Sequence, residues 1–195
     1  MISIGLTGGI GSGKTLVSKV FEKLGIPVFY ADMEAKRLMN EDEEIIIQLK
    51  NRFGADVYNE TGINKAKLAS VIFSDNKALE EVQGITHPKV RQNFFIWANE
   101  QKSPYVILEA AILFETGGYK QMDYNILVFA PEDMRIQRVV ERDNTTEEQV
   151  QKKIKNQQPD ENKFKMADWV IYNDGTKMLI PQIIELDKTI KEKTS

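Results

Sequence analysis

A run of glycines followed by a lysine and a threonine, near the start of the chain, has the spacing of a phosphate-binding loop. The segment reads Gly8, Gly9, Ile10, Gly11, Ser12, Gly13, Lys14 and Thr15. In the pattern G-x-x-x-x-G-K-[ST], backbone N–H groups surround the β-phosphate, the lysine reaches the outer phosphates and the hydroxyl ligates Mg²⁺. A turn that only joins a strand to a helix does not need this order of residues. The segment therefore predicts binding of a nucleoside triphosphate and transfer of its terminal phosphoryl group.

The phosphate-binding loop alone does not separate kinases from GTPases or motor ATPases. A GTPase would carry an N-K-x-D motif for base recognition late in the chain. The Asn-Lys pairs here, at Asn64-Lys65 and Asn76-Lys77, lie early and lack the aspartate. The sequence therefore disfavours a GTPase.

Three spaced arginines predict a helix that reaches the phosphates. Pro131 can begin a helix in which Arg135, Arg138 and Arg142 stand three and four residues apart and share one face. Phosphoryl transfer requires positive charge around the γ-phosphate and exclusion of water. For Arg135 we expect an ordinary solvated helix face with acidic neighbours. Arg138 and Arg142 are expected to act on the nucleotide.

A second helix is predicted directly after the arginine helix. Thr146 and Gln149 have the spacing of a capping box, in which the first side chain caps the backbone N–H of the second residue. The two helices would form a hairpin. A hairpin of this kind suits a lid that closes over a bound nucleotide.

Two carboxylates are predicted to end strands beside the phosphate-binding loop. Asp32 could accept a proton from an acceptor hydroxyl, orient that hydroxyl, or bind Mg²⁺ through water. The alternative for Asp32 is an N-cap of a helix over Glu34–Met39. Glu109 could assist the metal, and the alternative for it is an ordinary exposed carboxylate at a strand end.

His87 is the only histidine, and the chain has no cysteine. Pro88 follows it and is expected to keep His87 out of helical geometry, at the start of a helix. With no second histidine and no cysteine, a zinc site is excluded. Disulfides and a cysteine nucleophile are excluded as well.

Short apolar runs alternate with helical patterns, which is typical of βαβ units and a mostly parallel sheet. We therefore predict an α/β fold of the P-loop NTPase type, with a five-stranded sheet flanked by helices. The predicted strands are Ile2–Leu6, Pro27–Tyr30, Tyr105–Leu108, Tyr124–Phe129 and Trp169–Tyr172.

The long segment between the second and third strands is predicted to be a helical insertion with no strand. Helical patterns such as Ile45-Ile46-Leu49-Phe53 recur in it, and Gly54 and the turn residues Asn59–Gly62 would divide it into separate helices. Loops at the carboxyl ends of parallel strands surround the site in such folds, so this insertion is a natural place for a second-substrate pocket. The whole chain is expected to form a single domain.

The overall charge supplies no attraction for nucleic acid or anionic membranes. The chain has 26 basic and 29 acidic residues, a formal net charge of −3. No targeting segment is recognised at the start of the sequence, and we expect a cytoplasmic protein that is a monomer or a weak homo-oligomer.

The chain resembles the dephospho-coenzyme A kinase family along nearly its whole length. The resemblance rests on the order and spacing of many short segments, since each alone is weak. They are Gly5–Lys14, Ala31-Asp32, Phe53-Gly54, Thr86-His87-Pro88, Arg138, Arg142-Asp143, Gln157, Ala167-Asp168 and Asn173-Asp174-Gly175.

The resemblance implies transfer of the ATP γ-phosphate to the ribose 3′-hydroxyl of dephospho-CoA, with Mg²⁺. By that resemblance, Asp32, Lys14 and Arg142 are catalytic. ATP is held by the phosphate-binding loop and by Leu16, Arg138, Arg142 and Asn173, and Thr15 holds the metal. The acceptor is bound by Asp32, Lys36, Lys65, His87 and Arg91. Departures from the family pattern lie at Tyr30, Lys36, Lys65, Leu16 and Ala110–Leu113.

The sequence patterns and the resemblance together divide the chain by function. The nucleotide-binding core comprises 1–33, 101–130 and 158–195, the acceptor-binding region comprises 34–100, and the lid comprises 131–157. Two alternatives stay open. One is a P-loop kinase that acts on a nucleoside or nucleoside monophosphate, and the other is a regulatory protein that binds ATP without transferring phosphate.

Overall fold

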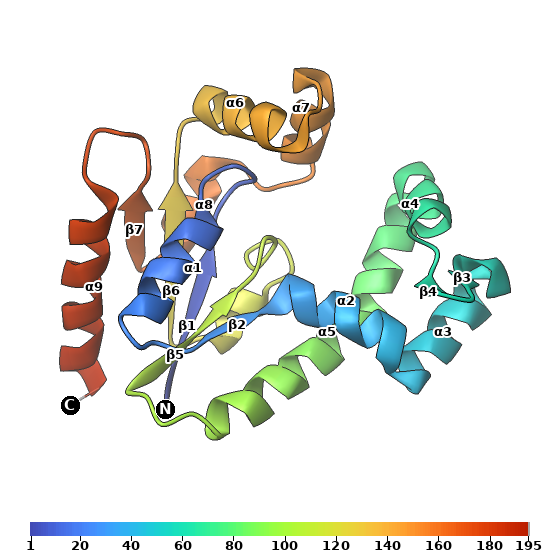
Figure 1. The fold of residues 1–195 in the computed structure, drawn as a ribbon, viewed down its shortest axis with the longest axis horizontal. Helices are drawn as coiled ribbons and strands as arrows, with labels where there is room; N and C mark the ends of the chain where they lie inside the picture. Colours follow the sequence, from blue (N-terminus) through green and yellow to red (C-terminus); the bar gives the residue numbers. More distant parts are fainter. Residues whose placement is uncertain (195) are drawn as a thin grey trace. The chain divides into compact units, whose positions relative to one another are not determined.

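The computed structural model of the chain describes residues 1–194, with the side chains of all of them except 73, 74, 76 and 194. The predicted core range 158–195 therefore ends on a residue, Ser195, that lies outside the described residues. The chain divides into two compact units. The sheet unit comprises Met1–Tyr30 and Ala98–Ser195, and the helical unit comprises Ala31–Trp97. Figure 1 traces both along the sequence.

The sheet unit contains all five predicted strands, in the order β2-β5-β1-β6-β7, and every neighbouring pair is parallel. The predicted α/β fold with a five-stranded sheet is confirmed. The strands are β1 (Ile2–Thr7), β2 (Val28–Tyr30), β5 (Tyr105–Glu109), β6 (Tyr124–Phe129) and β7 (Trp169–Tyr172).

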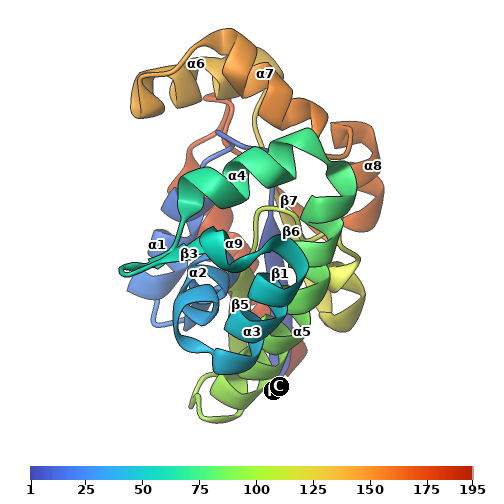
Figure 2. The same cartoon turned by 90° about the vertical axis from the view of Figure 1, so that its right-hand side faces the viewer.

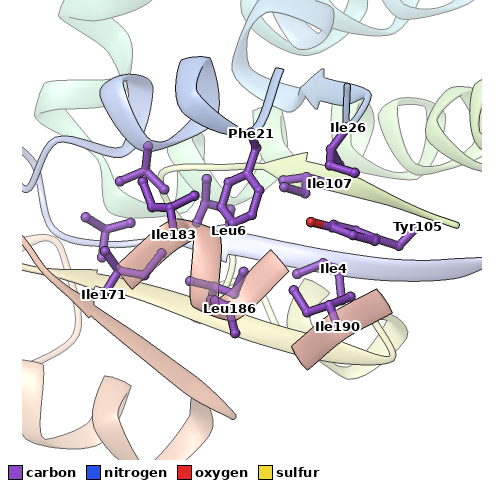
Figure 3. Close-up of a cluster of buried hydrophobic side chains, with 13 residues drawn as sticks. Ile4, Leu6, Phe21, Ile26, Tyr105, Ile107, Ile171, Ile183, Leu186 and Ile190 are labelled. Atoms are coloured by element: carbon purple, nitrogen blue, oxygen red, sulfur yellow. The ribbon is translucent and has the colours of Figure 1, made fainter. Parts of the chain in front are cut away.

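One face of the sheet is covered by α1 (Lys14–Lys23) and α9 (Leu179–Thr194), which contact each other. Their apolar side chains meet those of β1 in one buried cluster, in which Phe21 and Ile183 gather around Leu6 (Figure 3). Burial of each such side chain contributes roughly 1.5–3 kcal/mol to folding. This cluster fixes the central strand, from which the phosphate-binding loop leaves.

The opposite face is covered by the loop after β5, which includes the short helix η2 (Gly118–Gln121), and by α8 (Asp160–Met166). A Cβ atom at Gly5 in β1 would collide with Leu113 from that loop. The ring of Phe164 from α8 lies 5.0 Å from the ring of Phe129 at the end of β6. Helices and loops thus bury both faces, as the apolar strands require.

Two aspartates hold the beginnings of the strands in register. Asp123 accepts hydrogen bonds from the backbone N–H of Ser3, at 2.7 Å, and from its hydroxyl, at 2.9 Å. Asp168 accepts from the backbone N–H of Asn125 at 2.7 Å. Both contacts lie at the N-terminal ends of the strands. The loops at the C-terminal ends of the strands are therefore left for function.

The helical unit contains α2 (Ala31–Glu41), α3 (Glu43–Phe53), the short helix η1 (Ala55–Val57), α4 (Lys65–Ser74) and most of α5 (Asn76–Asn99). Gly54 ends α3 with a φ of 95°, as the predicted helix break requires. The prediction of no strand in this segment was wrong, because β3 (Tyr58–Asn59) and β4 (Gly62–Ile63) form a short antiparallel hairpin around the predicted turn. Two-residue strands carry too few apolar side chains to give a pattern.

Helix α5 runs through Pro88, so the prediction that His87 lies outside helical geometry at a helix start was wrong. A proline inside a helix removes one hydrogen bond and crowds the carbonyl four residues earlier, which here belongs to Gly84. Gly84 is exposed, and a Cβ atom there would meet nothing within 4 Å. The backbone therefore has room to adjust, and Figure 1 shows that α5 bends along its length.

The predicted helical hairpin is confirmed as α6 (Glu132–Asp143) and α7 (Glu147–Lys155), which lie side by side (Figure 2). Asn144 follows α6 in a left-handed conformation, and the Thr146 hydroxyl caps α7 by accepting from the N–H of Gln149. Among the residues that the structure describes, no helix is long and apolar enough to cross a membrane.

Candidate active site

The phosphate-binding loop joins the central strand β1 to the first turn of α1. Gly13 stands at the N-cap of α1 with a φ of 96°, and no side chain caps the helix there. The first turn of α1 contains no acidic residue. Unsatisfied N–H groups and the positive end of a helix dipole attract phosphate. The local structure therefore fits an anionic ligand at this point.

Charged and polar side chains complete the interior of the loop. The Lys14 ammonium donates to the carbonyl oxygen of Gly8 at 2.9 Å, so it lies inside the loop and not in bulk solvent. The Ser12 hydroxyl is buried and has no hydrogen-bond partner among the described residues. A buried hydroxyl without a partner is costly, and a phosphate oxygen would satisfy it.

Asn173, directly after β7, connects the loop to the arginine helix. Its side-chain amide donates to the carbonyl of Ser12 at 2.8 Å, and its own carbonyl accepts from Nη2 of Arg138 at 3.0 Å. The second guanidinium nitrogen of Arg138, Nη1, is buried without a partner among the described residues. The structure thus brings two predicted nucleotide residues, Arg138 and Asn173, to the loop.

The other two predicted nucleotide residues, Arg142 and Leu16, are exposed to solvent. The Arg142 guanidinium is 62% exposed and donates to the carboxylate of Asp143 at 2.7 and 3.0 Å, an arrangement that lowers the pKa of Asp143. Among the described residues, Arg142 makes no hydrogen bond or ion pair with the loop. Leu16 is an exposed residue of α1.

The expectation of a solvated Arg135 was wrong. This side chain is 3% exposed, and it lies against Gly9 of the phosphate-binding loop. Its main partner is Asp160, on a helix 25 residues later, at 2.9 Å. The neighbouring Glu132 is 3.9 Å away and more than half exposed. A partner so distant in the sequence forms no recognisable spacing with Arg135, whereas the nearby acidic residues suggest a solvated helix face.

The predicted metal site involves only one residue. Within the described residues, no group of three or more histidine, cysteine, aspartate or glutamate side chains could hold a metal ion. Mg²⁺ in phosphate-transfer sites takes one or two protein ligands and completes its shell with phosphate oxygens and water. Thr15, an exposed residue in the first turn of α1, fits that mode of binding.

Glu109 ends β5 and is 7% exposed, so the alternative of an exposed strand-end carboxylate was wrong. It pairs in register with Tyr30 at the end of β2. Burial and a hydrogen bond to Glu22 raise the pKa of Tyr30 to about 12, with a smaller contribution from Glu109. The tyrosine therefore stays protonated at neutral pH beside the glutamate.

In the helical unit, the predicted acceptor residues lie on α2, α4 and α5. Asp32 is exposed in the first turn of α2, which begins before it at Ala31, so its alternative role as an N-cap was wrong. Lys36 stands one turn further along α2, and Lys65 is the first residue of α4; both are exposed.

Asp32, His87 and Arg91 share one electrostatic environment. Burial, and to a lesser degree the charge of Arg91, lower the pKa of His87 below its ordinary value of 6.5, while the charge of Asp32 acts in the opposite direction. Glu34 fixes α2 against α5 by accepting from the Asn93 amide at 2.7 Å. The charges of Asp32 and Arg91 thus both act on His87, whose pKa below 6.5 leaves the imidazole mostly neutral at pH 7.

The lowered pKa of His87 has a consequence for stability. The unfolded chain takes up this proton at a higher pH than the folded chain, so the contribution of His87 is complete above about pH 6.5 and is lost as the pH falls through the folded-state pKa. We expect the free energy of unfolding of His87→Gln to fall less between pH 7.5 and 5.5 than that of the wild type. Urea unfolding at a series of pH values measures these free energies. Identical pH dependence in the variant and the wild type would contradict the prediction.

Comparison with known proteins gives matches along nearly the whole chain. The family model for dephospho-CoA kinase matches residues 2–178. A dephospho-CoA kinase of Bacteroides fragilis strain YCH46 is 40% identical over 193 residues, which cover 98% of this chain and 94% of that protein. A dephospho-CoA kinase of Porphyromonas gingivalis is 37% identical over 194 residues, covering 99% and 96%.

Solved structures share the fold. The structure of TT1252 from Thermus thermophilus covers the whole chain with a TM-score of 0.84 and 31% identity, and 98% of that chain is matched. A dephospho-CoA kinase from Campylobacter jejuni has a TM-score of 0.69 and 22% identity, covering 99% of this chain and 98% of that one. Its likeness concerns the fold alone. From the match over residues 2–178 and relatives that are about 40% identical along the full length, the chain belongs to the dephospho-CoA kinase family.

Proposed function

We propose that this chain transfers the γ-phosphoryl group of ATP to the ribose 3′-hydroxyl of dephospho-CoA, which gives coenzyme A in the last step of its synthesis. The observation that carries the proposal is the family match over residues 2–178. The phosphate-binding loop supports the ATP half of the reaction, because its uncapped helix and the Lys14 ammonium held at the Gly8 carbonyl fit a triphosphate.

The nucleotide is held by the sheet unit. The backbone of Gly8–Thr15 surrounds the β-phosphate, Lys14 neutralises the outer phosphates, and Leu16 lies beside the nucleotide. The free Nη1 of Arg138 and the position of Asn173 beside the loop support their roles in ATP binding. Thr15 would hold Mg²⁺, which when bound neutralises charge on the phosphates. ATP follows from the family, and Mg²⁺ is part of this proposal.

The chemical step is an in-line displacement. The 3′-hydroxyl oxygen of the acceptor attacks the γ-phosphorus, the bond from that phosphorus to the β,γ-bridging oxygen breaks, and ADP leaves. Asp32 orients the hydroxyl and accepts its proton. Lys14 and Arg142 stabilise the negative charge that develops on the transferred group.

The acceptor is bound by residues 34–100. Asp32, His87 and Arg91 share one environment, which supports a common binding surface. Arg91, Lys36 and Lys65 supply positive charge for acceptor phosphates, and His87 meets the acceptor as a neutral imidazole. Lysine is a point charge where arginine offers a fork, so the contacts of Lys36 and Lys65 are single hydrogen bonds rather than paired ones.

Residues 131–157 act as a lid that carries Arg142 to the transferred phosphate. Replacement of Arg142 by alanine is expected to lower kcat by about 10²–10³-fold, as for loss of one charge-stabilising donor. The fold should persist, because the side chain is 62% exposed. Steady-state kinetics at saturating ATP and acceptor measure the change. Lys152→Ala, which removes another exposed cation from the hairpin, is the control; a wild-type kcat for Arg142→Ala would contradict the assignment.

The acceptor is tested by a coupled assay with ATP and dephospho-CoA, in parallel with nucleosides and nucleoside monophosphates. We expect a higher kcat/KM for dephospho-CoA than for any smaller acceptor. A preference for a nucleoside monophosphate would favour the alternative kinase, and ATP binding with no phosphorylated product would favour a regulatory protein. The proposal also includes a cytoplasmic monomer or weak homo-oligomer without nucleic-acid or membrane partners. The net charge of −3 supports only the absence of those two kinds of partner.

A further inference from the structure

The buried side chain of Arg135 joins the two ends of the lid hairpin, residues 131–157. Its Nε donates to the carbonyl of Ala130 at 3.0 Å, directly before the hairpin. Its Nη2 lies 2.9 Å from Oδ2 of Asp160, three residues after the hairpin, at the first residue of α8. One guanidinium group therefore holds both the segment that leads into the hairpin and the segment that leaves it.

The same two ends contact the phosphate-binding loop. A Cβ atom at Gly9 would collide with the Arg135 guanidinium, and one at Gly11 would collide with the Arg135 backbone. Between them, the N–H of Ile10 donates to Oε1 of Gln157 at 2.9 Å. Three consecutive loop residues are thus each in contact with a residue at an end of the hairpin.

Polar contacts, more than apolar packing, hold this junction. A cavity of about 360 Å³ is lined by Arg135, Gln157 and Asp160 together with mostly charged or polar neighbours. Asp160 is 28% exposed, and its other carboxylate oxygen lies 3.7 Å from the buried ammonium of Lys163. Because the junction is not filled by apolar side chains, its geometry depends on the ion pair between Arg135 and Asp160.

We infer that Arg135 and Asp160 are positioning residues for ATP, because their ion pair fixes both ends of the lid hairpin against Gly9–Gly11 and so holds the loop in its phosphate-binding shape. The two side chains act through the loop backbone and need not touch the nucleotide. The inference rests on the proposed function only in taking ATP as the ligand of the loop. It predicts a defect in ATP affinity that is larger than the defect in turnover.

The test measures ATP affinity by calorimetry, KM and kcat in the coupled assay, and amide hydrogen exchange, for Arg135→Ala, Asp160→Asn and the double variant. We expect Kd for ATP to rise about 10–100-fold in Arg135→Ala, by analogy with metal sites, where loss of the side chains that orient the ligands weakens binding by this range. At saturating ATP, kcat should change less than about threefold. Asp160→Asn should raise Kd for ATP less than Arg135→Ala does. The double variant should bind ATP about as weakly as Arg135→Ala, since both substitutions remove the same ion pair.

Amide exchange separates this role from a merely structural one. Exchange should accelerate at residues 9–11 and at the two ends of the hairpin, while strand β1 stays protected. A loss of ATP affinity that follows faster exchange throughout the sheet unit would overturn the inference, as would wild-type affinity in both single variants. If Arg135→Ala does not fold, Kd for ATP and amide exchange are measured on Asp160→Asn and Arg135→Lys instead, because both substitutions nearly keep the side-chain volume.

Glu148→Gln and Lys152→Ala are the matched controls, since they break an exposed ion pair of 2.8 Å in the same hairpin. Both should bind ATP like the wild type. Failure of the proposed function would be seen separately: a wild-type chain that binds ATP and does not phosphorylate dephospho-CoA contradicts that proposal and leaves the binding and exchange results for Arg135 intact.

Discussion

Replacement of Asp32 by asparagine is expected to lower kcat by about 10²–10⁴-fold, the range for loss of a general base. Asparagine has the size and helix position of aspartate but cannot accept the proton of the 3′-hydroxyl. The side chain is exposed in the first turn of α2, so its loss should cost folding only the helix-dipole interaction, about 0.3–1 kcal/mol. The KM for ATP should stay within about twofold, because Asp32 is proposed to act on the acceptor.

Steady-state kinetics with ATP and dephospho-CoA, together with thermal unfolding, test the role of Asp32. Glu41→Gln is the control, since Glu41 is an exposed carboxylate on the same helix. An Asp32→Asn enzyme that keeps the wild-type kcat removes the proposed proton acceptor and leaves positioning by the other acceptor residues as the source of catalysis.

Replacement of Lys14 by alanine is expected to reduce kcat by about 10²–10³-fold and to weaken ATP binding as well. The ammonium lies inside the phosphate-binding loop, 2.9 Å from the Gly8 carbonyl, where no solvent ion can take its place in a fixed position. Arginine should not restore activity, because its planar fork is too large for the position of a compact ammonium.

Calorimetric titration with ATP and single-turnover kinetics separate the two effects of Lys14. Lys19→Ala on the same helix is the control, because Lys19 is exposed and lies outside the loop. Full activity of Lys14→Ala would mean that the loop binds phosphate through its backbone alone.

The strands could be predicted from the sequence because each is a short apolar run covered on both faces. Tyr124–Phe129 and Trp169–Tyr172 were predicted with the bounds that the structure has, and the others differ by one residue. The phosphate-binding loop was equally accessible, because all of its residues lie in one segment. Sequence patterns are therefore sufficient to predict an element that is formed by one continuous segment of the chain.

Prediction from the sequence fails where the burial or backbone conformation of a residue depends on a partner far along the chain or on an unusual neighbour. Arg135 looks like a surface residue beside Glu132, but Asp160 and the loop bury it. His87 looks like a residue outside a helix before proline, but the exposed Gly84 lets α5 continue. Neither the partner of Arg135 nor the freedom of Gly84 is visible as a spacing.

The order of the strands has a consequence for how the molecule can change. Strands β2 and β5 are hydrogen-bonded neighbours, yet the whole helical unit separates Tyr30 from Tyr105 in the sequence. The entropic cost of closing such a loop rises only with the logarithm of its length, so doubling the insertion would add about 0.6 kcal/mol. The sheet therefore sets almost no limit on the size of what is inserted between these strands. If the helical unit binds the acceptor as proposed, exchange of this one contiguous segment is expected to alter acceptor specificity.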